Sequence, residues 1–117
     1  KNETSMKVEF FSNNEKTSIL KEGVLSAKIR LEKIGILNEP TAKLVMVLYN
    51  KNIVSEVKTK NITLDANTQY NTEFNIELGN IEKNNINDCV VKIFLWTDFE
   101  TYRPLANIRS IDSFGIS

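Results

Sequence analysis

Residues 89–96 are Cys-Val-Val-Lys-Ile-Phe-Leu-Trp, a run that holds the only Cys and the only Trp of the chain. A short apolar run of this kind, bounded by polar segments, predicts a buried β-strand. Because an unpaired ammonium group in the core would be costly, we expect Lys92 on the outer face, together with Phe94 and Trp96. The core would then receive Val91, Ile93 and Leu95. We therefore predict that this run is the central strand of a β-sandwich, followed by a turn that ends at Pro104.

Other segments show the two-residue alternation of a strand with one buried face. The alternation is clear in residues 25–32 and 69–78, and a further one covers residues 5–11, with Met6, Val8 and Phe10 on one side. Residues 42–49 are apolar on both faces, which predicts a strand in the middle of its sheet or one with a covered outer face. Together with the run above, these patterns predict a core made of Leu25, Ala27, Ile29, Leu31, Leu44, Met46, Leu48, Phe74, Ile76, Leu78, Val91, Ile93 and Leu95.

Turns and loops are predicted where Asn, Asp, Gly and Pro gather, and they separate the strands at short intervals. The predicted turns and loops are residues 13–15, 38–40, 50–52, 65–68 and 79–88. Further strands are expected at residues 53–60 and 105–111, with 61–64 as a continuation or a separate strand and 112–117 as a tail or an edge strand. We therefore expect an all-β fold, an immunoglobulin/fibronectin-III-like β-sandwich of about seven to nine antiparallel strands, with a small barrel as the alternative.

The length and composition are those of one globular domain, with 41% hydrophobic and 26% charged residues. We expect residues 1–117 to form a single β-sandwich domain, with residues 1–23 as an N-terminal strand or extension and the core sandwich at about 24–111. Because the chain starts with Lys1 and not with Met, we expect a processed form or an excised fragment, with any signal peptide outside it.

The charge balance and the absence of His argue against several classes of function. The formal net charge is zero, with basic and acidic residues interleaved, so no basic face for nucleic acid is expected. No apolar run approaches the roughly 20 residues of a membrane helix, so no membrane insertion is expected. Without His, the chain lacks the commonest general base and the commonest transition-metal ligand. We therefore predict no enzyme activity, no cofactor and no catalytic residues.

Two apolar strands carry a further pattern. The first, Ala42–Tyr49, ends in Leu-Tyr and is followed by a turn and Ile53-Val54. The second, Val90–Trp96, is Val-Val-Lys-Ile-Phe-Leu-Trp and is followed by Arg-Pro-Leu-Ala at Arg103–Ala106. Through these segments, the chain resembles a family of bacterial immunoglobulin-like or fibronectin-III-like modules. The resemblance covers residues from about 24 to 108. These modules occur in large secreted and cell-surface proteins of clostridia and other Gram-positive bacteria.

The resemblance implies an accessory module with no catalytic residues, in a secreted or cell-surface bacterial protein. One departure is Thr97, since the family more often has an acidic residue directly after the Trp. We expect a spacer or a protein-interaction unit, whose partners are neighbouring domains of the same polypeptide or other surface proteins. A carbohydrate-binding module that takes polysaccharide is one alternative, and a strand-sharing adhesin or pilin subunit is another.

Phe94, Trp96 and Tyr102 form the candidate ligand or partner surface. Exposed aromatic rings can stack on sugars or bind a protein partner. Tyr49 and Tyr70 could join such a platform. The competing hypothesis is that the rings are structural and covered by the N-terminal segment, by the turn around residues 102–105, or by a neighbouring domain.

The remaining reactive groups have simpler interpretations. Cys89 is expected to be a buried or half-buried thiol, because no His could activate it. The chain also has carboxylates near predicted turns, at Asp65, Asp88, Asp98, Glu100 and Asp112. We expect these to be solvated turn residues; a structural calcium at the loop ends is the alternative, and no metal ligand is assigned.

Overall fold

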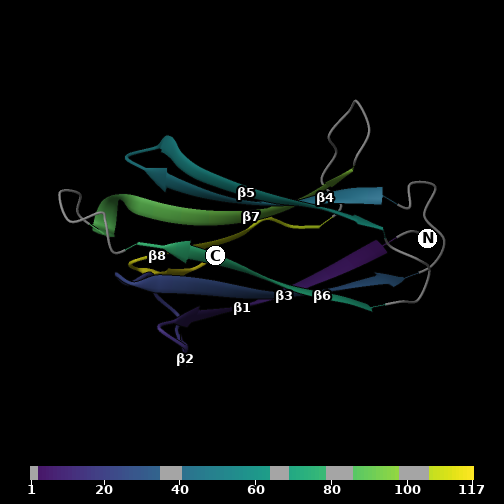
Figure 1. The fold of residues 1–117 in the computed structure, drawn as a ribbon, viewed down its shortest axis with the longest axis horizontal. Coiled ribbons are helices and arrows are strands. Elements are labelled where there is room, and N and C mark those ends of the chain that lie inside the picture. The colour runs from purple at the N-terminus through teal and green to yellow at the C-terminus, as the bar shows by residue number, and fades with distance from the viewer. Residues whose placement is uncertain (1–2, 35–40, 64–68, 79–85, 98–105) are drawn as a thin grey trace.

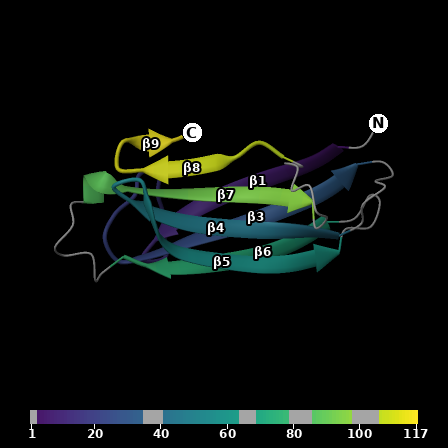
Figure 2. The same ribbon diagram turned by 90° about the horizontal axis from the view of Figure 1, so that it is seen from above.

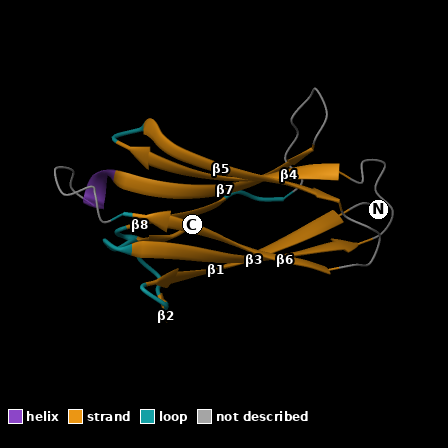
Figure 3. Ribbon diagram, viewed as in Figure 1, coloured by secondary structure: helices purple, strands orange, loops and turns teal. Residues whose placement is uncertain are grey.

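In the computed structural model, two antiparallel sheets pack face to face (Figures 1 and 3). The structure describes residues 3–34, 41–63, 69–78, 86–97 and 106–117. The strand order is β2-β1-β3-β6 in the first sheet and β5-β4-β7-β8-β9 in the second. The first sheet contains β1 (Glu3–Ser12), β2 (Glu15–Lys16), β3 (Val24–Ile34) and β6 (Gln69–Glu77). The second contains β4 (Thr41–Asn50), β5 (Ile53–Thr63), β7 (Cys89–Thr97), β8 (Arg109–Asp112) and β9 (Gly115–Ile116), and a short 3₁₀ turn, η1 (Ile86–Asp88), precedes β7.

This strand order confirms the predicted immunoglobulin/fibronectin-III-like sandwich. In immunoglobulin lettering, β1, β3 and β6 correspond to A, B and E, and β4, β7 and β8 correspond to C, F and G. The strand after C is β5, which pairs with β4 in the second sheet, as C′ does in variable domains, and not with the E strand. The predicted position of β7 is also confirmed, because it is the middle strand of its sheet.

All the predicted core residues are buried between the two sheets, and none is more than 4% exposed. The core also receives Met6 and Phe10 from β1, which pairs with β3 along its whole length. The N-terminal segment is thus an inner strand of the sandwich, and the core extends to the N-terminal side of residue 24. Leu20, in the connection from β2 to β3, is buried too, and its backbone N–H donates to the carbonyl of Asp112 at 2.8 Å.

Asparagine shapes two of the tight hairpin turns, and both lie where the sequence predicts them. Asn13 and Asn14 have φ angles of 50° and 70°, and Lys51 and Asn52 have 52° and 66°. Positive φ at both central residues is the requirement of a type I′ turn, whose twist matches that of the two strands it joins. Residues 61–63, predicted either to continue the preceding strand or to form another, are the end of β5. Asp112 is the last residue of β8, and the edge strand β9 follows it.

Cationic side chains cross between the sheets at both open sides of the sandwich. On the side of β5 and β6, Lys58 donates to the carbonyl of Asn75. Lys60 donates to the Thr72 hydroxyl and, at 3.3 Å, to the carbonyl of Glu73. On the opposite side, the guanidinium of Arg109 in β8 donates to the carbonyl of Met6 in β1 at 3.2 Å. These contacts satisfy main-chain acceptors that would otherwise lie at open sheet edges.

Gly23 marks the entry to β3 and allows a direct test of this turn. Its φ is +110°, and a Cβ there would lie 2.5 Å from the side-chain oxygen of Asn13, which accepts the backbone N–H of Val24. We expect Gly23→Ala to lower the free energy of unfolding by about 1–3 kcal/mol, measured by urea denaturation. In an Asn13→Gly background, where the clashing amide is gone, the same substitution should cost less. Equal costs in both backgrounds would contradict the role of the Asn13 contact.

Candidate functional site: the outer face of the second sheet

The outer face of β7 carries Lys92, Phe94 and Trp96, as the sequence predicts. Each of these side chains is half-buried, while Val91, Ile93 and Leu95 between them are at most 1% exposed. Strand register places the three outward residues opposite neighbours in β4 that also face outward. The pairs are Lys92 with Val47, Phe94 with Val45, and Trp96 with Lys43. The cost of burying one ammonium group is therefore sufficient to predict which face of β7 points away from the core.

The rings of Phe94 and Trp96 form a pair on this face. Their centroids are 4.9 Å apart and their planes are tilted by 36°. A separation and tilt of this kind are favourable for aromatic packing. Because the planes are tilted, the two rings do not present one flat surface.

Valine side chains continue the apolar surface across β4. Val45 and Val47 are only 4% and 6% exposed, although they point away from the core. Lys92 lies directly opposite Val47, and its ammonium is 5.4 Å from the centre of the Tyr49 ring, in cation–π geometry. The predicted apolar character of both faces of β4 thus has a physical cause, since the strand lies between β5 and β7.

The surface extends onto the edge strand β5. Val57 lies opposite Val47 and is 50% exposed, and Val54 lies opposite Tyr49 and is 53% exposed. A β-bulge between Leu48 and Tyr49 shifts the register here. We call the set of Val45, Val47, Tyr49, Val54, Val57, Phe94 and Trp96 the outer apolar face.

Only part of the predicted aromatic surface comes together. Tyr102 lies outside the described residues. Tyr70 is on the inner face of β6 and packs against the core. Tyr49 shares the outer face but pairs with Val90, six residues from Trp96 along β7 and so about 20 Å away. Within the described chain, Phe94 and Trp96 are thus the aromatic residues that meet.

The N-terminal segment does not cover Phe94 and Trp96. That hypothesis is wrong for residues 3–34, because β1 pairs with β3 in the opposite sheet. The turn at residues 102–105 lies outside the described residues. Cover by a neighbouring domain stays a prediction.

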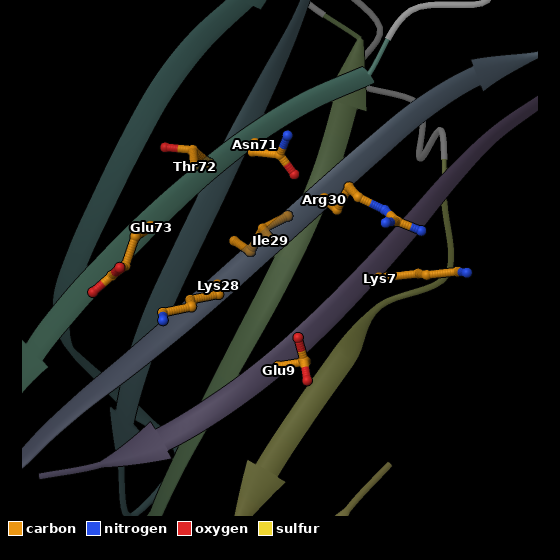
Figure 4. A pocket seen from close by; sticks show the side chains of 8 residues that line it. All are labelled: Lys7, Glu9, Lys28, Ile29, Arg30, Asn71, Thr72 and Glu73. Carbon is orange, nitrogen blue, oxygen red and sulfur yellow. The ribbon is translucent and has the colours of Figure 1, made fainter. Parts of the chain in front are cut away.

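The opposite outer face, on the first sheet, is charged, and it contains a shallow hollow of about 610 Å³ that is not among the predicted sites (Figure 4). Across β1, β3 and β6, one row is Lys7, Arg30 and Asn71, and the next is Glu9, Lys28 and Glu73. The sequence shows the polar positions of the three alternating strands. Only the strand order in the sheet shows that these positions lie side by side. Mixed signs and open access to water are typical of a solvated surface.

The charged groups in this hollow also have partners nearby. Glu9 forms an ion pair with Lys16 at 3.1 Å, and Lys28 lies 4.6 Å from the centre of the Phe11 ring. Exposed pairs of this kind contribute little stability. The hollow is therefore a mixed-charge surface and not a strongly basic or acidic site.

Of the predicted carboxylates near turns, Asp88 and Asp112 lie among the described residues. Asp112 accepts the backbone N–H groups of Phe114 and Gly115, at 2.8 and 3.0 Å, and so shapes the turn between β8 and β9. Asp65, Asp98 and Glu100 lie outside the described residues. Among the residues that the structure does describe, no group of three or more His, Cys, Asp or Glu side chains could hold a metal ion.

Cys89, the first residue of β7, is fully buried and forms no disulfide. Burial raises the pKa of its thiol, and the neighbouring Asp88 carboxylate raises this pKa further. Both effects disfavour the thiolate, which is the reactive form. The predicted inert thiol therefore agrees with its position in the fold.

Comparisons with known proteins leave the chain without an assigned family: no family model matches it, and no curated protein is significantly similar to it. Among the described residues, no helix is long and apolar enough to cross a membrane.

Burial of Cys89 predicts both slow thiol chemistry and a pH dependence. We expect a disulfide reagent such as Ellman's reagent to modify the folded protein at least about a hundredfold more slowly than the urea-unfolded chain, because access requires opening of the fold. In the unfolded chain the thiol has its ordinary pKa of about 9.0, below its raised pKa in the fold.

The Cys89 contribution to stability is therefore complete below the ordinary thiol pKa of about 9.0 and declines as the pH rises toward the folded pKa. Comparison of urea denaturation with a Cys89→Ala variant isolates this slope from the titration of lysines. Rapid modification of the folded protein, or identical pH slopes for the two proteins, would contradict the assignment.

Proposed function

We propose that the chain is a non-catalytic module of a secreted or cell-surface bacterial protein, and that it serves as a spacer or a protein-interaction unit. The observation that carries this proposal is the difference between the two outer faces. One face is charged and solvated, with Lys7, Glu9, Lys28 and Arg30 exposed. The other is the outer apolar face, which includes an aromatic pair and two half-exposed valines.

An apolar patch with aromatic residues is a common feature of protein interfaces. Aromatic side chains are enriched at contact surfaces, and contiguous exposed apolar patches often mark them. Phe94 and Trp96 are half-buried and stand beside the nearly buried valines of β4. A partner that covers this face would bury Val54 and Val57 as well, which adds hydrophobic stabilisation. Neighbouring domains of the same polypeptide, or other surface proteins, are the partners that we propose.

The resemblance to bacterial surface modules supports the same function. Its Phe-Leu-Trp motif at residues 94–96 places Leu95 in the core and the two rings on the outer face. The motif therefore combines a framework position with two positions available for contacts. A module with this framework can join larger proteins while its outer face contacts the next domain.

A carbohydrate-binding module is the second candidate, and one observation favours it. Lys43 and Asn61 lie in the same cross-strand row as Trp96, so polar groups that could bond sugar hydroxyls stand beside a ring. The tilt between Phe94 and Trp96 counts against a flat stacking platform. We therefore place protein contact first.

Trp96 is the only Trp of the chain, so its fluorescence reports directly on the outer apolar face. We expect no change in emission when the protein is titrated with xylan, cello-oligosaccharides, chitin oligosaccharides or peptidoglycan fragments. Lys43→Ala, next to the ring, and Lys7→Ala, on the opposite face, serve as matched variants. A saturable shift that Lys43→Ala weakens and Lys7→Ala preserves would favour the carbohydrate-binding module instead.

The complete coding sequence gives a second test of the same proposal. We expect it to encode an export signal and neighbouring domains. In a protein that contains the chain and its neighbour, Trp96 emission should move to shorter wavelength as the ring is covered. A complete protein without an export signal would contradict the proposed location, and one without a neighbouring domain would contradict the spacer role.

A further inference from the structure

The two described sheets end at β2, β6, β5 and β9, and β1 is open along residues 3–10, because β2 pairs only with Phe11 and Ser12. β2 and β9 have two residues each, too few to template a new strand. In β6, the carbonyls of Glu73 and Asn75 already accept N–H groups from Lys60 and Lys58. On the open part of β1, Arg109 donates to the carbonyl of Met6. β5 is the long terminal strand of its sheet, with eleven residues and no described strand on its outer side. Figure 2 shows β5 along the same side of the sandwich as β6.

We propose that β5 pairs with the β5 strand of a second copy of this chain, antiparallel, with Val57 opposite Val57 of the second copy. A contact of this kind uses the same surface on both copies and closes as a dimer with twofold symmetry. The two five-stranded sheets would become one continuous sheet, so that the outer apolar face continues across the junction. The proposal does not rest on the outer apolar face having another partner.

Charge complementarity selects the second copy as the partner. With Val57 at the twofold axis, Glu56 lies opposite Lys58 of the other copy, and this pairing occurs twice. The two Val57 side chains meet on the outer face. Opposite charges and apolar pairs directly across two strands are each stabilising. Glu56 and Lys58 of one copy already form an ion pair at 3.7 Å, and their side chains are 39% and 40% exposed, so both can also reach a second copy.

Other registers that keep the same face outward place like charges together. An axis at Glu56 puts two carboxylates opposite each other, and an axis at Lys58 puts two ammonium groups opposite each other. An axis at Thr59 sets Lys58 opposite Lys60 of the second copy. Like charges directly across strands are destabilising. Within residues 56–59, the axis at Val57 is thus the one that satisfies every charge.

The expected dimer is weak. The register of β5 is regular from Glu56 to Thr63, and with the axis at Val57 the bulge at Ser55 of each copy limits the length of regular pairing. The contact therefore lies below the size of a standard stable interface. Dimers should therefore form at high protein concentration, or where several copies are held close together on one surface.

Charge reversal tests the proposal directly. Sedimentation velocity at rising concentration should show a reversible shift from monomer to dimer. Glu56→Lys and Lys58→Glu should each raise the dimer dissociation constant at least about fivefold, because each creates two like-charge pairs. The double variant E56K/K58E restores opposite pairs in the same register and should recover dimerisation. Glu9→Lys and Lys7→Glu, on the opposite sheet, make the same changes in net charge and should have no effect.

A cysteine scan tests the register and does not depend on charge. Paired residues have Cα atoms about 4.5–5.5 Å apart, within the range that a disulfide spans. Val57→Cys should therefore form a disulfide-linked dimer on mild oxidation. Thr59→Cys should not, because its two copies would be four residues out of step, roughly 14 Å apart along the strands. Circular dichroism establishes that each variant is folded, and E56K keeps the contact of Lys58 with Asn75.

Each outcome of these experiments either supports or contradicts the proposed β5 pairing. Loss of the dimer in the single variants, recovery in the double variant and selective cross-linking at residue 57 would support the proposal. A monomer at every concentration would overturn it, and so would a dimer that ignores charge at residues 56 and 58. Neither negative result bears on the outer apolar face, which the Trp96 measurements test separately.

Discussion

The exclusion of the Lys92 ammonium group from the core determines the two faces of β7, and through β7 the faces of its whole sheet. Residues directly opposite each other in paired strands point to the same side, so the register transmits this choice to β4 and β8. Val47 and Ser110 lie opposite Lys92 and face outward with it. A slip of one residue would turn Ile93 outward and bury a charge, which combines lost hydrophobic burial with a desolvation cost.

Much of this fold can be predicted from the sequence, because most strands repeat with a period of two residues. The buried faces of β3, β6 and β7 and the two Asn-containing hairpin turns follow from local pattern alone. The faces of β5 do not follow from this local pattern. Its Lys58 and Lys60 point toward the interior side, opposite Met46 and Leu44, while Val57 points outward. Pattern alone would reverse these faces, but β5 borders the open side of the sandwich, where ammonium groups can reach the carbonyls of β6.

In the candidate site, too, some features follow from local pattern and others only from the pairing of strands. Phe94 and Trp96 could be placed on the outer face from their spacing to Lys92. Their apolar surroundings could not be foreseen, because Val54 and Val57 join them only through the pairing of β4 with β5. The charged hollow on the first sheet likewise needs β1, β3 and β6 side by side, and β6 is far from the other two in the sequence. Local pattern thus predicts faces well, whereas surfaces shared by several strands require the topology.

The cations that cross between the sheets act on main-chain oxygen atoms. Lys58, Lys60 and Arg109 reach the carbonyls of Asn75, Glu73 and Met6, which every amino acid would supply. The contacts therefore constrain where the backbone runs and not which residue occupies the acceptor position. Over evolutionary drift, a cation should persist on one strand while its acceptor position varies. Such contacts leave no covariation between residue pairs. A set of homologous sequences would therefore not reveal these hydrogen bonds between the two sheets.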